Sequence, residues 1–329
     1  LAIIATFGLV ASASAVKVNN NLSINGFIDG SYENVNGGTT ASERQSLEVD
    51  EVELNFIFNV GNVSGLVAYD SHPAGDHAGV GLEQAHFTYN INDAVSVTFG
   101  RYASSLGLER EDPAGLYTYS RAYSNDYNDS GVNQGSEFNF GNIDGVYGSV
   151  DGIKLAYSGE AYTLGLSLEN DSDVTGDLQT DDLDIEISFS YTGLENTVIG
   201  GGYHTENQQA GAATESNALN VFATRQFGKL LLGAEYSEID TEANGFAGAI
   251  DDSRDAYLVL ADYDFNDKIG VAVRISSTEK AANAGDLDRF TIAPNYAITD
   301  SLGAIIEYSD IDDAGSDIEE YAVELTYTF

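Results

Sequence analysis

Residues 319–329, at the end of the chain, read EEYAVELTYTF. Tyr321, Val323 and Leu325 occupy alternate positions, and Glu320 and Glu324 lie between them. Successive side chains of a β-strand point to opposite faces of its sheet. The stretch therefore predicts a strand with one apolar face and one polar face, and the apolar series continues to the final Phe329.

The same alternation recurs upstream. In 181–191, 268–279 and 288–298 one face carries Leu183, Ile185, Ile187, Phe189, Tyr191, Ile269, Val271, Val273, Ile275, Phe290, Ile292, Pro294, Tyr296 and Ile298. The opposite face carries Asp184, Glu186, Ser188, Ser190, Arg274, Ser276, Arg289, Thr291 and Asn295. An apolar face toward lipid and a polar face toward an aqueous lumen is the pattern of a transmembrane β-barrel.

Sixteen such strands are expected, at 22–32, 45–60, 64–70, 80–91, 95–102, 144–158, 162–170, 181–191, 197–206, 215–227, 230–239, 255–265, 268–279, 288–298, 301–311 and 319–329. The connections between them alternate strictly between long and short, and the last long one is expected at 312–318. Short periplasmic turns and long external loops are typical of outer-membrane barrels. The predicted fold is all-β: one antiparallel up-and-down transmembrane barrel over residues 16–329.

Composition narrows the function further. The formal net charge of −40 argues against nucleic-acid binding, which needs a basic surface. With no cysteine among 329 residues, disulfides and thiolate chemistry are excluded. Residues 1–15 are apolar and end in small residues, so they read as the tail of a signal peptide. No later apolar run is long enough for a membrane-spanning helix.

The longest interval without strand alternation is 103–141, the third external loop by this count. It contains the charged run Glu109, Arg110, Glu111 and Asp112, then Pro113, Arg121 and the tyrosines Tyr117, Tyr119, Tyr123 and Tyr127. Folded inward, its acids would face Arg274 or Arg289 and constrict the lumen. The alternatives are an exposed loop with local ion pairs, a plug that closes the barrel, or tyrosines that stack on sugars.

The expected lumen face is mainly acidic. Its acids are Asp29, Glu53, Glu169, Asp184, Glu186, Glu235, Glu307, Glu320 and Glu324, and its bases are Lys154, Arg274 and Arg289. Acidic rings in a pore favour cations, so a weak cation preference is expected. The simpler interpretation, that these residues are just the wet face of a barrel, is compatible with this one.

Two positions break the pattern. The second expected strand changes phase at Asp50-Glu51, which predicts a β-bulge or a strand that extends past the membrane. Arg101 falls on the lipid face, so either a bulge at Gly100 turns it inward or it snorkels at the outer interface.

Acidic pairs and runs at Asp181-Asp182, Asp251-Asp252 and 310–313 lie in or near external loops and are candidates for Ca²⁺ or Mg²⁺. The alternative is that they are solvated. Catalysis is not expected, because no serine lies in a recognisable nucleophile motif and the four histidines are His72, His77, His86 and His204.

Locally, Glu83-Gln84-Ala85, Gly100-Arg101, Gly107-Leu108-Glu109 and residues 112–117 resemble the OmpL-like β-barrel porin family. This resemblance implies a Gram-negative outer-membrane channel for passive diffusion, with lipid and lipopolysaccharide as surroundings. By analogy it also implies a homotrimer. A C-terminal Phe329 is similar to the signal read by the barrel assembly machinery. A substrate-specific channel and a plugged structural or adhesive barrel remain alternatives.

Overall fold

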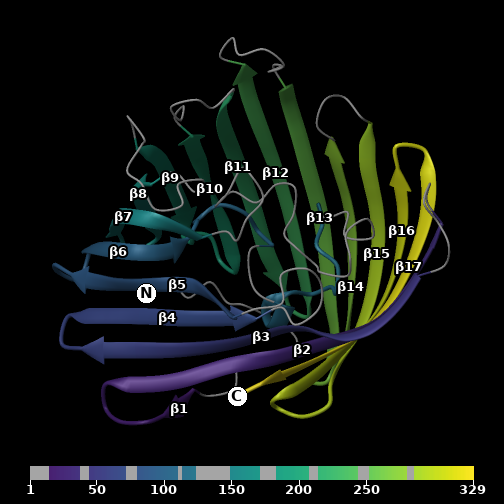
Figure 1. Cartoon of the computed structure of the whole chain (residues 1–329), viewed down its shortest axis with the longest axis horizontal. Coiled ribbons are helices and arrows are strands. Elements are labelled where there is room, and N and C mark those ends of the chain that lie inside the picture. Colours follow the sequence, from purple (N-terminus) through teal and green to yellow (C-terminus); the bar gives the residue numbers. More distant parts are fainter. Residues whose placement is uncertain are drawn as a thin grey trace.

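The computed structural model describes residues 15–37, 44–71, 80–109, 113–123, 149–170, 183–206, 214–243, 252–279 and 285–329. Sixteen antiparallel strands form a closed barrel, as the alternation predicts, and a two-residue strand β1 pairs beside β2. Figure 1 shows the strands side by side in chain order around one continuous sheet. The expected signal segment lies outside the described residues.

The strands are β1 (Val16–Lys17), β2 (Leu22–Gly37), β3 (Arg44–Val60), β4 (Val63–Ser71), β5 (Val80–Asn90), β6 (Val95–Ala103), β7 (Ser149–Ser158), β8 (Tyr162–Glu169), β9 (Asp184–Tyr191), β10 (Thr197–Glu206), β11 (Thr214–Phe227), β12 (Leu230–Ala243), β13 (Asp252–Asn266), β14 (Ile269–Glu279), β15 (Asp286–Ala297), β16 (Leu302–Asp313) and β17 (Ser316–Thr328). One 3₁₀ turn, η1 (Pro113–Gly115), follows β6. No helix in these ranges is long and apolar enough to cross a bilayer.

The barrel closes where the last strand meets the first. β17 pairs with β2 from Ile318↔Gly37 to Thr328↔Phe27. Beyond that ladder, the Gly26 and Phe329 amides each donate to the other's carbonyl, at 3.1 and 3.0 Å. A Cβ at Gly26 would lie 2.2 Å from the Glu53 carbonyl oxygen and 3.0 Å from the Phe329 ring, so only glycine fits there. Closure leaves no unpaired edge in the membrane.

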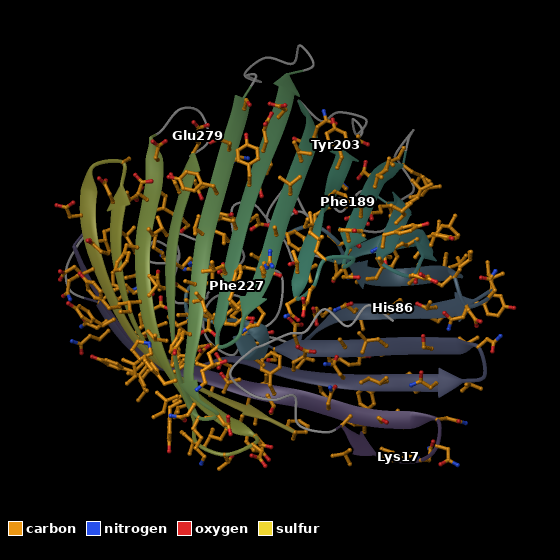
Figure 2. All side chains as sticks on the ribbon, turned by 180° about the vertical axis from the view of Figure 1, so that it is seen from behind. Lys17, His86, Phe189, Tyr203, Phe227 and Glu279 are labelled. Carbon is orange, nitrogen blue, oxygen red and sulfur yellow. The ribbon has the colours of Figure 1, made fainter. Side chains whose placement is uncertain are left out.

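The outer surface is a band of apolar side chains, as the strand alternation predicts. Exposed members include Phe99, Leu155, Leu166, Ile187, Phe189, Tyr203, Val221, Phe227, Val259, Ile275, Phe290, Ile306, Val323 and Leu325. Phe189, Tyr203 and Phe227, labelled in Figure 2, come from three different strands. Polar residues at the alternate positions of the same strands, such as Glu186 and Thr291, are buried inside the barrel.

The predicted phase change in the second long strand is a β-bulge. β2 pairs Asp29 with Glu51 but Gly30 with Val49, so Asp50 is the extra residue of β3. No bulge occurs at Gly100, and Arg101 stays on the outer face. There its Nε lies 2.9 Å from an oxygen of Asp151, the residue opposite it on β7. The alternative of a bulge at Gly100 is therefore wrong, and Arg101 pairs with Asp151 on the outer face.

The expected long loop at 312–318 is wrong. β16 continues to Asp313 and β17 begins at Ser316, so Ala314 and Gly315 alone connect them. Both have positive φ, 52° and 88°, which suits a two-residue hairpin turn whose twist matches its strands. The Gly315 amide also donates to Asp312 at 2.6 Å. Long and short connections therefore do not alternate strictly.

A charge on the outer band should test the membrane-facing assignment. Val259 lies near the middle of β13 and is 53% exposed. Replacing it in Val259→Arg should destabilise the barrel by about 2–4 kcal/mol, because the bilayer midplane penalises arginine. Urea unfolding in lipid vesicles measures the loss. The matched change Ser253→Arg, near the outer end of the same strand, should cost about 0–1 kcal/mol, and equal losses would contradict the assignment.

Candidate functional site: a segment fastened inside the barrel

The described part of the third external connection folds into the barrel. Leu106, Leu116, Thr118, Ser120 and Tyr123 are each 5% exposed or less. Residues 104–109 and 113–123 contact wall side chains on β9, β11, β12, β14 and β16, and η1 lies against β17 and β2. We call these two stretches the internal segment. The sequence hypothesis of an inward fold agrees with this placement.

Wall side chains hold the internal segment by accepting hydrogen bonds from its backbone amides. On β9, Glu186 accepts from the Ser105 amide at 3.1 Å and from the Ser104 hydroxyl. On β11, the Asn220 side-chain oxygen accepts from the Gly107 amide at 3.0 Å. The segment's first turn thus follows the wall from strand to strand. Hydrogen bonds to charged acceptors are stronger than neutral ones.

Glu235 on β12 accepts hydrogen bonds from residues near both ends of the internal segment. One carboxylate oxygen accepts from the Leu108 amide at 2.7 Å and from the Asn220 side-chain amide at 2.6 Å. The other accepts from the Tyr123 hydroxyl at 3.1 Å. Burial, together with the Glu235 charge, raises the pKa of Tyr123 well above its usual value. The phenol therefore keeps its proton and remains a donor.

Glu307 on β16 holds the return of the segment. Its carboxylate accepts from the Tyr119 amide at 2.7 Å, and from the amide and the hydroxyl of Ser120. The Tyr119 hydroxyl accepts from Ser31 of β2 at 3.2 Å. Burial, with the Glu33 charge as a lesser cause, raises the pKa of Tyr119 as well. Tyr119 and Tyr123 therefore join the segment to the wall of the barrel through hydrogen bonds.

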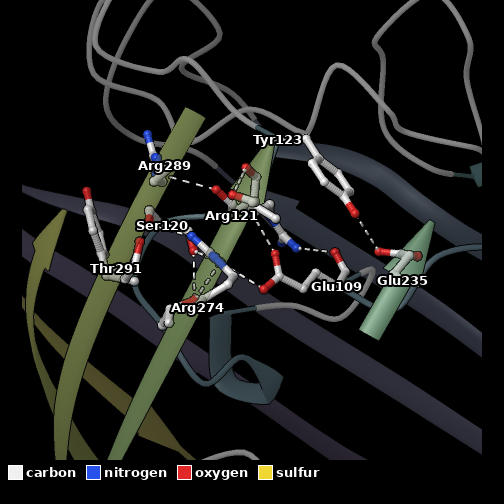
Figure 3. A network of polar contacts seen from close by, with 12 residues as sticks. Glu109, Ser120, Arg121, Tyr123, Glu235, Arg274, Arg289 and Thr291 are labelled. Atoms are coloured by element: carbon white, nitrogen blue, oxygen red, sulfur yellow. Dashed lines mark hydrogen bonds and ion pairs between the residues drawn. The ribbon is translucent and has the colours of Figure 1, made fainter. Parts of the chain in front are cut away.

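Arg274 on β14 pairs with the segment's own acid (Figure 3). Its Nη1 lies 2.8 Å from Glu109 Oε1 and also donates to Thr118 Oγ1 and the Ser120 carbonyl. Arg121 donates to the Glu109 carbonyl at 3.0 Å, which folds the segment back on itself. The predicted encounter of Glu109 with a wall arginine is thus present as a direct, buried ion pair.

The second wall arginine has a different partner. Arg289 Nη2 lies 3.5 Å from Glu320 Oε2 on β17, and Nη1 is 3.4 Å from the Arg121 carbonyl. Lys154 on β7 donates to Ser105 Oγ at 2.7 Å and lies 4.0 Å from Glu186. Lys154 and Arg289, predicted as lumen bases, therefore both reach the internal segment. Arg110, Glu111 and Asp112 lie outside the described residues.

An apolar seat beneath the segment was not predicted. Leu106, Ala122 and Tyr123 pack against lumen-facing side chains of β11–β16: Ala218, Ile239, Ala256, Leu258, Leu260, Ala272, Ala293 and Ile305. Residues 256–261 read AYLVLA, without alternation, because the segment covers the lumen face of this strand while Tyr257 and Val259 point outward. Burying each leucine contributes about 1.5–3 kcal/mol.

A glycine on β10 makes room for the segment. A Cβ at Gly202 would lie 2.6 Å from Leu106 Cδ2 and 2.1 Å from the Ile187 carbonyl oxygen. Gly202 is the last of three consecutive glycines in this strand, Gly200, Gly201 and Gly202. Their presence in an otherwise β-forming stretch is the signal of a close approach by another part of the chain.

The remaining candidate residues lie on the lumen face as predicted. Glu53 and Asp184 are buried there, 3% and 5% exposed. His204 Nε2 lies 3.3 Å from Glu169, and His86 packs edge-on against Tyr102. In the described ranges no group of three His, Cys, Asp or Glu side chains is placed to hold a metal. Asp181, Asp182, Asp251, His72, His77 and Tyr127 lie outside those ranges, and Asp310–Asp313 belong to β16.

Burial of the lumen face varies along the strands. Lumen-facing residues such as Asn220, Ser237, Glu53 and Glu169 are buried, whereas Asn55, Thr98, Ala156 and Thr224, nearer the short turns, are half-buried. The contacts described above join the internal segment to strands from β7 around to β2.

A closed barrel with an apolar belt and a polar lumen crossed by an internal segment defines an outer-membrane channel protein of the porin class. The sequence matches the model of the "beta-barrel porin-2, OmpL-like" family over residues 18–321, and the chain belongs to that family. The protein is accordingly placed in the outer membrane of a Gram-negative bacterium. No curated protein matches the sequence.

Solved outer-membrane proteins share the fold at low sequence identity. An anion-selective porin from Comamonas acidovorans is 14% identical, with a TM-score of 0.68 over 94% of this chain and 99% of that one. The outer-membrane channel DcaP of Acinetobacter baumannii is 15% identical, with a TM-score of 0.66 over 96% and 100%. The trimer form of OmpT from Vibrio cholerae is 12% identical, with a TM-score of 0.63 over 94% and 99%.

Removing the Glu235 carboxylate should release the internal segment from the wall. Glu235→Leu leaves the Leu108 amide, the Tyr123 hydroxyl and the Asn220 amide without their acceptor, at about 1–3 kcal/mol for each buried group. Trypsin should then cleave the detergent-solubilised barrel after Arg121 much faster than it cleaves the unmodified protein. The control Glu238→Leu makes the same change on the outward face of β12. Equal cleavage rates in both variants would contradict the anchoring role.

The Glu109–Arg274 pair should show strong coupling in a double-mutant cycle. Arg274→Met should destabilise the barrel by about 3–5 kcal/mol, because it leaves a buried carboxylate unpaired. The double variant Arg274→Met/Glu109→Gln should lose less than the sum of the single losses. Urea unfolding in vesicles measures all four proteins, and additivity within about 0.5 kcal/mol would show that the pair is not coupled.

Proposed function

We propose that this protein is a water-filled channel for passive diffusion of small hydrophilic solutes and ions, with a weak preference for cations. A closed sixteen-stranded barrel with a segment fastened along its inner wall carries the proposal. The segment contacts strands from β7 around to β2, and lumen-facing side chains such as Asn55, Thr98 and Ala156 remain half-buried. A sixteen-stranded barrel is wide enough for an aqueous lumen, and a segment along one wall narrows it.

The proposed ion preference rests on the charges of the lumen. Lumen-facing acids on β17, β2, β3 and β4 include Glu320, Glu324, Asp29, Glu33, Glu48, Glu51, Glu53 and Asp70. The basic residue on these four strands is Arg44, whose Nη2 lies 3.2 Å from Glu33 Oε2. An acidic wall raises the local concentration of cations. One solved porin of this fold is described as anion-selective, so the lining, and not the fold, has to determine the sign.

Two alternatives have weaker support. A sugar-specific channel would use exposed tyrosines, but Tyr119 and Tyr123 are committed to the wall. A plugged structural barrel requires the segment to fill the lumen, and half-buried lumen side chains such as Asn55 and Thr98 favour an open path beside it. We also propose that the protein forms a homotrimer, since one solved structure of this fold is a trimer. Two further proposals are that lipopolysaccharide contacts the outer rim and that the assembly machinery recognises Phe329.

Single-channel recording in planar bilayers tests the function. The purified protein should give stable ohmic openings, and in a KCl gradient the reversal potential should take the sign of cation preference. The anchoring variant Glu235→Leu should change the conductance, whereas Glu238→Leu should not. A protein that inserts without conducting would support the plug, and an anion-selective reversal potential would refute the proposed preference.

A further inference from the structure

We propose that the short-turn rim of β11–β14 binds the headgroups of anionic phospholipids in the inner leaflet, through Arg225, Lys229 and Lys268. The contact lies on the outside of the barrel, so it does not depend on the proposed conduction. The whole chain has 13 lysines and arginines and a formal net charge of −40. Three basic residues on two neighbouring hairpins are therefore a local departure from the acidic composition.

The two hairpins lie side by side. Lys229 is in the turn between β11 and β12, Lys268 is in the turn between β13 and β14, and β12 pairs with β13. The Lys229 carbonyl accepts from the Asp264 amide at 3.0 Å, and its Nζ donates to the Phe265 carbonyl at 2.6 Å. The Lys229 side chain thus reaches across to the hairpin that carries Lys268. An ammonium group has three donors, so one such bond leaves it able to contact a headgroup.

Arg225 points to the bilayer. It pairs with Thr197 on β10 and with Leu232 on β12, and Leu232 is 41% exposed on the outer face. Cross-strand partners share a face of the sheet, so Arg225 also faces outward. Its guanidinium carbon lies 4.8 Å from the centre of the Phe227 ring. Stacking of this kind uses the flat face of the guanidinium, and its N–H edge can then donate to phosphate oxygens.

Aromatic side chains place these bases at headgroup level. Phe227, Tyr263 and Phe265 are 49%, 41% and 55% exposed beside the same two turns, and Phe227 is labelled in Figure 2. The Tyr263 and Phe265 rings pack edge-on with their centroids 5.2 Å apart. Aromatic girdles lie at the membrane interfaces of outer-membrane barrels, and the short turns are periplasmic. Basic groups at this level therefore meet the phosphates of the inner leaflet.

The neighbouring acids confine the site to this part of the rim. Asp267 precedes Lys268, so the two turns and Arg225 together carry three bases and one acid. Asp264 pairs with Gly270 at a lumen-side position. The turns on either side, between β9 and β10 and between β15 and β16, carry Glu195 and Asp300. Attraction of an anionic headgroup is thus limited to β11–β14.

The other end of the same strands has the opposite charge. At outward positions there, Glu238 pairs directly with Asp255, and Glu279 pairs directly with Asp286. Acids at these positions repel an anionic lipid. One strand such as β13 therefore offers two ends of opposite sign to the bilayer, and each end can be probed separately.

Tryptophan quenching tests the proposal, because the chain has no tryptophan of its own. Phe265→Trp places a single reporter beside the basic rim, and Tyr257→Trp places one at the acidic end of the same strand. In phosphatidylcholine vesicles, brominated phosphatidylglycerol and brominated phosphatidylcholine are compared as quenchers. At position 265 phosphatidylglycerol should bind about fivefold more tightly than phosphatidylcholine or better, since each basic residue near a surface contributes about that factor. At position 257 no preference for phosphatidylglycerol is expected.

Arg225→Gln/Lys229→Gln in the Phe265→Trp protein should abolish the preference, and so should raising the salt from about 0.05 M to about 0.5 M. The control Arg101→Gln removes an outward base from the other end of the barrel and should leave it unchanged. Equal quenching of Phe265→Trp by the two lipids would overturn the inference, and this comparison needs no further variant. A preference that survives loss of both bases would overturn the assignment to these residues. Either result leaves the proposed channel function untouched, since conduction is measured separately.

Discussion

The structure depends on buried carboxylates that accept hydrogen bonds from the backbone amides of a segment lying inside the barrel. Glu186, Glu235 and Glu307 come from three separate strands, and each binds a different part of that segment. A strand presents such an acid to the lumen only because its alternate residues face lipid. The segment in turn satisfies acids that would otherwise be buried without partners, which is costly. Barrel wall and internal segment therefore stabilise each other.

The lumen carboxylates thus fall into two groups. Some accept hydrogen bonds from amides or pair with Arg274, and they attach the internal segment to the wall. Others, such as Glu48 and Glu51 on either side of the bulge at Asp50, lie half-buried on the lumen face of β3. The sequence alone does not separate these groups, because both have the same parity in their strands. Burial and the direction of neighbouring amides distinguish them.

Most of the fold was predictable because lipid imposes a simple rule on every strand. The apolar alternation of 319–329 and the phase change at Asp50 both correspond to observed structure. The inward path of the internal segment was harder, because its partners lie far along the chain, 188 residues apart for Tyr119 and Glu307. The non-alternating stretch 256–261 was the available signal for the apolar seat. The loop expected at 312–318 failed because Ala314 accepts a left-handed backbone that is unusual for alanine.

The seam between β17 and β2 has a consequence for the order of folding. Its pairs, such as Thr326 with Asp29, join residues 297 positions apart. Contacts of such separation form slowly, because a very long loop must close before they contribute. Until β17 pairs with β2, both strands are open edges that other chains could pair with. The seam therefore determines when the first long strand ceases to be prone to aggregation.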